Sequence, residues 1–249
     1  MRRGRLIAQD EDPKEEAARR QKKVKSLRTL AKNITGLRHK LAIDLKDKDE
    51  KVRLTALAIS IIDKTAERVG NDDSAKDGHF GVTGFRPKHI KVEGAKIRLK
   101  YTGKSGVDHE KEFTDKAMAK MLSECIKRNK GKRLLTTEDG FEIKADKVNR
   151  YLSEFDVTAK DLRGYAANRL VIDCLTSLDG KLDEKERKKK FSEILTKVAE
   201  KVGHQRATLK KHYLLPRVEE DYVGKGKIVN LKEASVVEIL VASLLGEFC

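Results

Sequence analysis

The feature that most constrains this chain is a hydrophobic period that switches from helical to strand-like and back. Apolar residues recur at helical spacing from Val24 to Leu45 and again from about Asp49 to Ala66. After a polar, glycine-containing loop, three segments alternate apolar and polar residues instead, at positions 89–92, 96–101 and 107–113. Because alternation is the period of a half-buried strand, and short turn-forming stretches separate the segments, the pattern predicts a three-stranded antiparallel meander.

Helical spacing returns after the third segment. It predicts helices over 115–127, 145–155, 158–178, 191–202 and 207–213, with Pro216 ending the last one. Thr158 and Asp161 approximate a capping box for the longest. The expected fold class is α+β and mainly α, with a helical domain over 24–217 that carries one small three-stranded antiparallel sheet. We expect 1–23 to be a charged arm, flexible or folded as one exposed helix, and 218–249 to be a tail containing an apolar helix.

The chain is strongly basic. Its 249 residues include 56 Lys and Arg against 40 Asp and Glu, a formal net charge of +16. Such an excess indicates a polyanionic partner, and DNA, RNA and an anionic membrane surface all fit the charge alone. The longest apolar stretch, 234–245, is too short to cross a bilayer and contains Glu238. Since the start also lacks a secretory hydrophobic region, we expect an intracellular protein that is neither secreted nor membrane-bound.

Several common active-site patterns are absent from the sequence. There is no GxxxxGK[ST] phosphate loop, no HExxH zinc motif and no CxxC pair. What remains is a set of basic residues and one tyrosine, placed where the chain turns or where a helix begins or ends. They are Arg68, Lys104, Arg163, His204 and Tyr213. Each alone has an ordinary structural interpretation, such as a helix-end cation, an exposed turn or a partly buried ring.

Six short motifs surround these residues in a fixed order. They are Arg68–Val69–Gly70–Asn71, the segment from Phe80 to Arg86 followed by His89, Gly103–Lys104–Ser105–Gly106 with His109 beyond it, Val148 to Leu152, Thr158 to Arg163, and Gly203–His204 with Tyr213. Together they resemble the catalytic domain of type IB DNA topoisomerases, especially the short viral and bacterial forms. The resemblance extends from about Val24 to Pro216.

The resemblance implies the fold of the DNA breaking-rejoining enzymes and a specific chemistry. Tyr213 would attack a DNA phosphate to give a 3′-phosphotyrosine. Three side chains would neutralise the phosphoryl oxygens, namely Arg68, Arg163 and His204, while Lys104 would protonate the departing 5′-oxygen. The partner would be duplex DNA, bound by a monomer, with no ATP, metal or other cofactor. We also expect DNA contacts from residues in or beside the motifs: Asn71, Phe80, Arg86, His89, Lys160 and Lys210.

Side-chain chemistry is consistent with these roles. A tyrosine phosphodiester keeps the energy of the bond it replaces, so religation needs no other energy source. The phenol has an ordinary pKa of roughly 10 and needs help to lose its proton. Arginines can each donate two hydrogen bonds to phosphoryl oxygens, and a histidine can add another.

The match has departures, and two other functions remain open. Gly164 and Tyr165 stand where the family usually has Thr and Trp, and Gly84 replaces a Thr. The family's β-rich N-terminal domain needs more than residues 1–23, so we expect a truncated form or a different grip on DNA. A tyrosine recombinase or integrase shares the nucleophile but usually has His-x-x-Arg where this chain has Lys160 to Arg163. A non-catalytic DNA-binding module derived from the same fold would also explain the basic charge.

Overall fold

The computed structural model describes residues 12–178 and 181–229. This part is mainly helical with one three-stranded antiparallel sheet, which confirms the expected fold class. The helices are α1 (Pro13–Asp44), α2 (Glu50–Thr65), α3 (Asp72–Lys76), α4 (Lys116–Arg128), α5 (Ala145–Ser153), α6 (Ala159–Thr176), α7 (Glu184–Val202), α8 (Arg206–His212) and α9 (Pro216–Glu219). The strands are β1 (Ile90–Glu93), β2 (Lys96–Thr102) and β3 (Asp108–Thr114). Short helical turns are η1 (Val82–Gly84), η2 (Pro87–His89), η3 (Lys104–Gly106) and the π-helical η4 (Glu220–Gly224).

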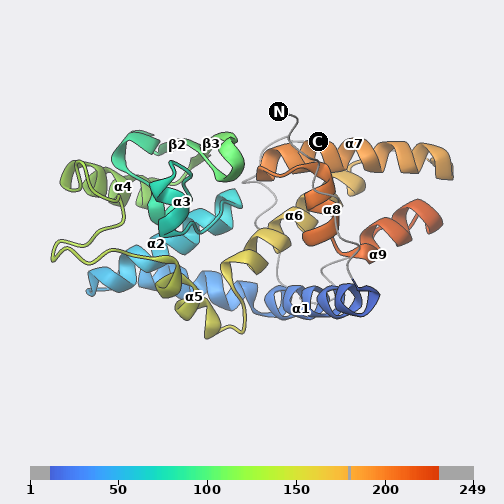
Figure 1. Cartoon of the computed structure of the whole chain (residues 1–249), viewed down its shortest axis with the longest axis horizontal. Coiled ribbons are helices and arrows are strands. Elements are labelled where there is room, and N and C mark those ends of the chain that lie inside the picture. The colour runs from blue at the N-terminus through green and yellow to red at the C-terminus, as the bar shows by residue number, and fades with distance from the viewer. Residues whose placement is uncertain (1–11, 179–180, 230–249) are drawn as a thin grey trace, which may run out of the picture.

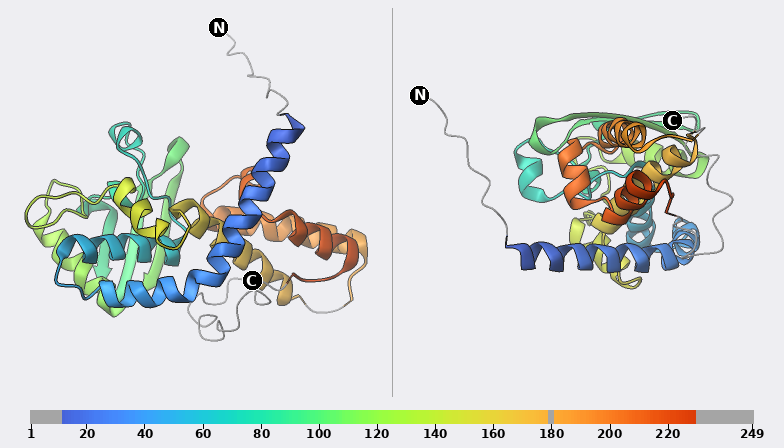
Figure 2. Two further views of the ribbon diagram at one scale, coloured as in Figure 1. Left: turned by 90° about the horizontal axis from the view of Figure 1, so that it is seen from below. Right: turned by 90° about the vertical axis from the view of Figure 1, so that its right-hand side faces the viewer.

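The long helix α1 begins earlier than the sequence pattern predicted. The Asp12 side chain accepts a hydrogen bond from the Lys14 backbone N–H at 2.9 Å and so caps the helix. Residues 13–23 are therefore the first turns of α1, mostly exposed, and they continue into the helix expected from Val24. These residues are mostly Lys, Arg, Glu, Gln and Ala, which favour helix without making an apolar stripe. The first turns project beyond the rest of the molecule (Figure 2).

Helix α2 forms the centre of one half of the molecule. Every residue from Leu54 to Ile62 is buried, so the helix is enclosed on all sides. Asp49 caps its start, and it ends at Ala66, whose φ of 55° turns the chain out of the helix. That turn is followed by Glu67, which is fully buried, and by Arg68, which is half-buried.

The sheet is the expected meander, in the order β1-β2-β3. On β2, Ile97, Leu99 and Tyr101 alternate into the core, as the period of two predicted. Tyr101 lies directly opposite His109 of β3, which is also buried. Helix α4 packs against β1 and β2.

The remaining helices form the second half. Asp183 and Glu186 make a capping box at the start of α7, which ends at Gly203 with a φ of 68°. Helix α8 already ends at His212, and Pro216 is the first residue of α9. The expectation that Pro216 ends the preceding helix is therefore wrong, because a proline at the first helical position costs no hydrogen bond. The apolar stretch 234–245 lies outside the described residues.

Helix α6 joins the two halves, each of which has its own apolar core. Leu162 and Tyr165 pack into the core shared with α1, α2, the sheet, α4 and α5. One turn further on, Ala167, Leu170 and Val171 pack into the core of α7, α8 and α9. In Figure 1 the sheet lies to the left and α7 to α9 to the right, with α6 between them and α1 along the lower edge. None of the described helices is both long and apolar enough to cross a bilayer.

Candidate active site

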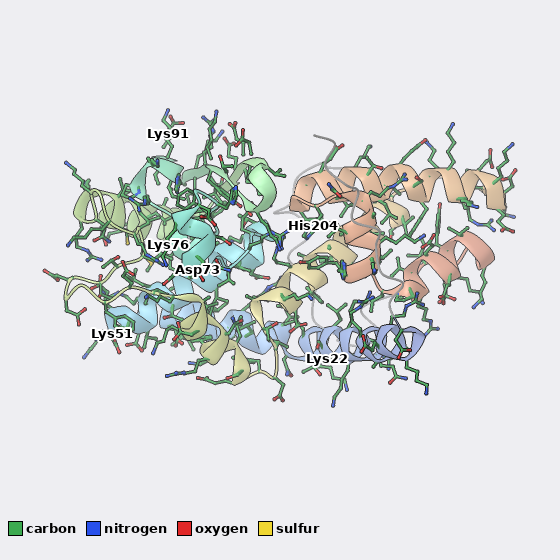
Figure 3. The ribbon with its side chains drawn as sticks, in the orientation of Figure 1. Lys22, Lys51, Asp73, Lys76, Lys91 and His204 are labelled. Carbon is green, nitrogen blue, oxygen red and sulfur yellow. The ribbon has the colours of Figure 1, made fainter. Side chains whose placement is uncertain are left out.

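Four of the five residues expected to act in catalysis come together where the two halves meet. Arg68 follows α2, Arg163 lies on α6, His204 lies between α7 and α8, and Tyr213 follows α8. Figure 3 shows His204 at the junction of the two halves. The convergence joins segments that are separated by up to 145 positions, from residue 68 to residue 213.

Arg163 is the centre of this group. It is buried, with 4% of its surface exposed. Its Nη1 donates to the Tyr213 hydroxyl at 3.3 Å, while Nε and Nη2 donate to the backbone oxygens of Ala66 and Val202 at 2.5 and 3.0 Å. Ala66 directly follows α2, and Val202 is the last residue of α7. The two backbone contacts therefore fix the guanidinium between segments from the two halves of the molecule. Burial lowers the pKa of Arg163, and the nearby Tyr213 opposes that shift.

His204 lies between Arg68 and Tyr213. Nη2 of Arg68 is 3.3 Å from His204 Nδ1, and the rings of His204 and Tyr213 have centroids 4.3 Å apart. Burial, followed by Arg163 and Arg68, lowers the pKa of His204 to about 3, so the ring is neutral near pH 7. Because arginine can only donate, Nδ1 accepts, and the ring proton belongs on Nε2. That N–H remains available to donate to a phosphoryl oxygen.

The loop that carries Arg68 is held by close backbone packing. The backbone N–H groups of Val82 and Thr83 donate to the oxygens of Arg68 and Val69 at 2.9 and 2.8 Å. A Cβ at Gly81 would lie 2.5 Å from the Gly70 nitrogen and 2.7 Å from the Arg68 oxygen. The motif from Arg68 to Asn71 and the motif from Phe80 to Arg86 therefore pack directly against each other. Their backbones are so close that only glycine fits at position 81.

Asn168 holds the segment that carries Tyr213, a contact that was not predicted from the sequence. Its Nδ2 donates to the backbone oxygens of Gly164 and Tyr213 at 2.7 and 2.8 Å, and its Oδ1 accepts from the Leu215 N–H at 2.8 Å. The side chain is 1% exposed, so water cannot replace these bonds. The available sequence signal was a polar residue at helical spacing from the apolar Leu175 and Val171, on the buried face of α6.

A buried ionic cluster behind the site was also missed. Glu67 is fully buried, with Lys111 Nζ 2.8 Å from its Oε1 and the Tyr101 hydroxyl donating to its Oε2. Burial alone would raise the pKa of Glu67, but contacts with His109, Lys111 and Tyr101 outweigh it and lower this pKa to about 2. The carboxylate is therefore charged. His109 and Lys111 are two residues apart on β3 and therefore lie on the same, inward-facing side of the strand. That spacing could have indicated from the sequence that polar side chains point into the core.

Lys104 is the predicted catalytic residue that the structure does not bring into the group. It lies in η3, at the exposed tip of the hairpin between β2 and β3. The hairpin is closed by a hydrogen bond from the Gly103 N–H to the Val107 oxygen at 2.7 Å.

Comparison with known proteins identifies the family of this chain. A family model described as eukaryotic DNA topoisomerase I, catalytic core, matches residues 12–236. The chain belongs to this topoisomerase I family. The match confirms the resemblance to a type IB topoisomerase catalytic domain and favours it over a tyrosine recombinase.

Two named topoisomerases are similar to this chain over part of their length. DNA topoisomerase 1B of Acanthamoeba polyphaga mimivirus is 28% identical over 187 residues, which cover 69% of this chain and 55% of the viral protein. DNA topoisomerase 1 of Caenorhabditis elegans is 39% identical over 79 residues, 30% of this chain and 10% of the nematode protein. The chain thus spans only part of the length of the relatives it matches.

The residues expected to contact DNA fall into two groups on the topoisomerase core. Arg86 and Lys160 are exposed, and so is Lys210, which forms an ion pair with Glu219 at 2.7 Å. The other three have structural roles in the free protein. Asn71 caps α3, Phe80 packs 4.3 Å from the ring of His89, and His89 is buried with its Nδ1 accepting from the Arg86 N–H. Burial, together with Lys88 and Arg86, lowers the pKa of His89 to about 4.

Proposed function

We propose that this topoisomerase core relaxes supercoiled duplex DNA by transient cleavage of one strand. The observation that carries the proposal is the hydrogen bond from Arg163 Nη1 to the Tyr213 hydroxyl at 3.3 Å, beside the contact between Arg68 and His204. A phenolic nucleophile held among cationic and N–H donors fits attack on an anionic phosphodiester.

In the cleavage step, the Tyr213 oxygen bonds to phosphorus and the bond from phosphorus to the 5′-oxygen breaks. The phenolic proton passes to solvent, and the Lys104 ammonium gives a proton to the departing 5′-oxygen. Arg68, Arg163 and the Nε2–H of His204 stabilise the extra negative charge on the phosphoryl oxygens. By analogy with other oxyanion donors, each is worth about 3–4 kcal/mol of transition-state stabilisation.

Religation reverses these transfers. The freed 5′-hydroxyl attacks phosphorus, the bond to Tyr213 breaks, and Lys104 recovers its proton. Since one phosphodiester replaces another in each direction, the cycle consumes neither ATP nor metal, and its net result is a change of DNA topology.

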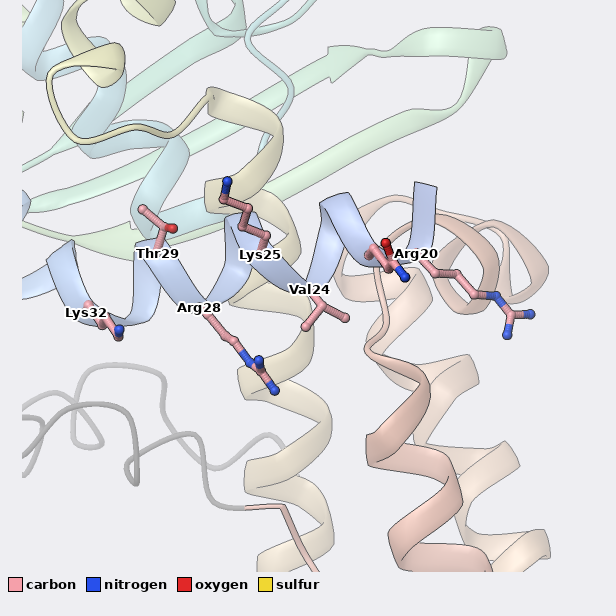
Figure 4. A pocket seen from close by; sticks show the side chains of 7 residues that line it. Arg20, Val24, Lys25, Arg28, Thr29 and Lys32 are labelled. Atoms are coloured by element: carbon pink, nitrogen blue, oxygen red, sulfur yellow. The ribbon is translucent and has the colours of Figure 1, made fainter. Parts of the chain in front are cut away.

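Basic side chains beside the nucleophile support DNA backbone binding. Lys23 of α1 donates to the backbone oxygen of Lys211 at 3.3 Å, and burial together with Arg20, Arg19 and Lys160 lowers its pKa to about 8. Cations gathered in this way are stabilised when a phosphate comes close. The same part of α1 lines a hollow of about 520 Å³ (Figure 4). Four of its lining residues are basic, namely Arg20, Lys25, Arg28 and Lys32, and the others are Gln21, Val24 and Thr29. Its four cations make this part of α1 a candidate contact for the DNA backbone.

The test is relaxation of supercoiled plasmid in EDTA without ATP. Wild type should relax the plasmid and form a covalent adduct on a nicked duplex, whereas Tyr213→Phe should bind the duplex and do neither. Tyr222→Phe is the matched control, because Tyr222 is also buried but packs on Phe191. DNA binding by the wild type without an adduct would instead indicate a non-catalytic binding module. In gel filtration we expect the same preparation to elute as a monomer. Its proposed substrate places the protein on DNA inside the cell.

A further inference from the structure

His109 lies between the two segments that present Lys104 and His204. Gly103 directly precedes Lys104, and a Cβ there would lie 2.6 Å from His109 Nε2. Gly203 directly precedes His204, and a Cβ there would overlap Cε1 of the same ring and lie 2.8 Å from Nδ1. The imidazole therefore fills the space between the two backbones, with a glycine on each side.

Glu67 and Tyr101 fix the orientation of this ring. The His109 ring stacks on Tyr101 with centroids 4.9 Å apart and an interplanar angle of 9°. Its Nδ1 is 3.6 Å from Oε1 of Glu67, the residue directly before Arg68. Lys111, which pairs with Glu67, also donates to the Thr65 oxygen at the end of α2 at 2.6 Å. One buried cluster thus touches the segments that lead to Arg68, Lys104 and His204.

We propose that His109 is a positioning residue that sets the Lys104 hairpin against the His204 loop, with Glu67 as its anchor. The inference rests on the proposed function, in which Lys104 must reach the departing 5′-oxygen from an exposed turn. Removing the ring leaves every proposed catalytic side chain chemically intact but takes away the spacer that separates the two backbones, so the Lys104 hairpin can shift. The specific consequence is a loss of protonation of the leaving group.

A sulfur atom in place of the bridging 5′-oxygen tests that consequence. A thiolate leaves without a proton, since a thiol, with a pKa of about 8.5, is a far stronger acid than the 5′-alcohol that it replaces. On the strongest cleavage site mapped with wild type, His109→Ala should cleave the oxygen duplex about 100-fold more slowly, the scale of a displacement of about 1 Å. On the sulfur duplex most of that loss should disappear, as it should for Lys104→Ala. Equal losses on the two duplexes, or none on either, would overturn the inference.

Gly103→Ala supplies a second test that keeps His109. The φ of Gly103 is −94°, which alanine adopts without strain, so the substitution acts only through the contact with the ring. It should slow cleavage of the oxygen duplex by itself and add little in a His109→Ala background, where the new Cβ has room. Unchanged cleavage of the oxygen duplex by Gly103→Ala would refute the spacer role even if His109→Ala failed to fold, and additive effects would refute it where both variants fold.

The proposed function is read out separately in the same assays. Wild type should form an adduct on both duplexes and Tyr213→Phe on neither. The absence of any wild-type adduct would refute the proposed function together with this inference. A normal wild-type adduct with equal losses in His109→Ala would refute the inference alone.

Discussion

Arg163 donates from Nη1 to the Tyr213 hydroxyl across 3.3 Å, and its guanidinium carbon lies 5.6 Å from the centre of the same ring. The two contacts give the nucleophile a charged neighbour at its oxygen and along its face. The other guanidinium nitrogens are held by backbone oxygens, so this neighbour cannot swing away without breaking two buried hydrogen bonds.

Arg163→Lys should slow formation of the covalent adduct by about 10²–10³-fold, since one ammonium cannot replace a forked donor. Arg163→Ala should in addition destabilise the protein by about 2–4 kcal/mol, because the Ala66 and Val202 oxygens lose a buried donor. Single-turnover cleavage and urea unfolding measure the two effects. Arg150→Lys, at an exposed position of α5, is the control and should match wild type. Normal cleavage by Arg163→Lys would contradict the role.

The lowered pKa of His204 predicts a pH dependence of stability. The folded value is about 3 and the ordinary value 6.5, so between them the unfolded chain binds a proton that the folded protein does not. This contribution is fully present above about pH 6.5 and is lost as the pH falls toward 3. His204→Gln should therefore lose less stability than wild type between pH 6.5 and 4, measured by urea midpoints. The exposed His39→Gln should follow wild type, and equal slopes for all three would show that His204 is not the titrating group.

Asn168→Ala should lower stability and slow cleavage together. The substitution leaves the Tyr213 oxygen and the Leu215 N–H without partners, a cost of about 2–4 kcal/mol. Because the nucleophile loses its backbone support, adduct formation should fall about 100-fold. In contrast, Asn33→Ala removes one hydrogen bond to the Phe155 oxygen, away from the site, and should leave cleavage unchanged. Thermal melting and single-turnover cleavage measure both variants, and unchanged cleavage by Asn168→Ala would refute the support role.

Gly81→Ala should displace the Arg68 loop, because the new Cβ would lie 2.6 Å from the Gly70 Cα, which is backbone and cannot rotate away. We expect a loss of about 1–3 kcal/mol from overpacking and slower cleavage. Gly84→Ala is the matched control in the same short segment, where the nearest atom is 3.5 Å away and belongs to the Ala75 side chain. Equal behaviour of the two variants in melting and cleavage assays would contradict the packing argument.

Most of the fold could be predicted because its elements carry a strong local period. The three strands match the predicted segments to within a residue or two, and Thr158 and Asp161 make the capping box that their spacing indicated. The start of α1 could not be found this way, since residues 13–23 are charged and have no apolar stripe. The short α3 was also missed, because its cap by Asn71 lies within a polar run that resembles a loop.

The site was predictable in its residues but not in its supports. The motifs pointed to Arg68, Arg163, His204 and Tyr213, which do converge. They gave no sign that Lys104 would stand apart from them in the free protein. Glu67 and Asn168 were missed for a physical reason: each acts through partners far along the chain, Lys111 in one case and Leu215 in the other. Spacing along a sequence does not report such contacts.

Helix α6 contributes side chains to both apolar cores and also carries Arg163. Because α6 belongs to both cores, melting one core exposes part of the other, and we expect the two halves to unfold as one cooperative unit on heating. The grouping of Tyr213 with Arg68 and Arg163 should then be lost in a single transition. We therefore expect no partly unfolded species that keeps the proposed cleavage of DNA but has lost the proposed religation.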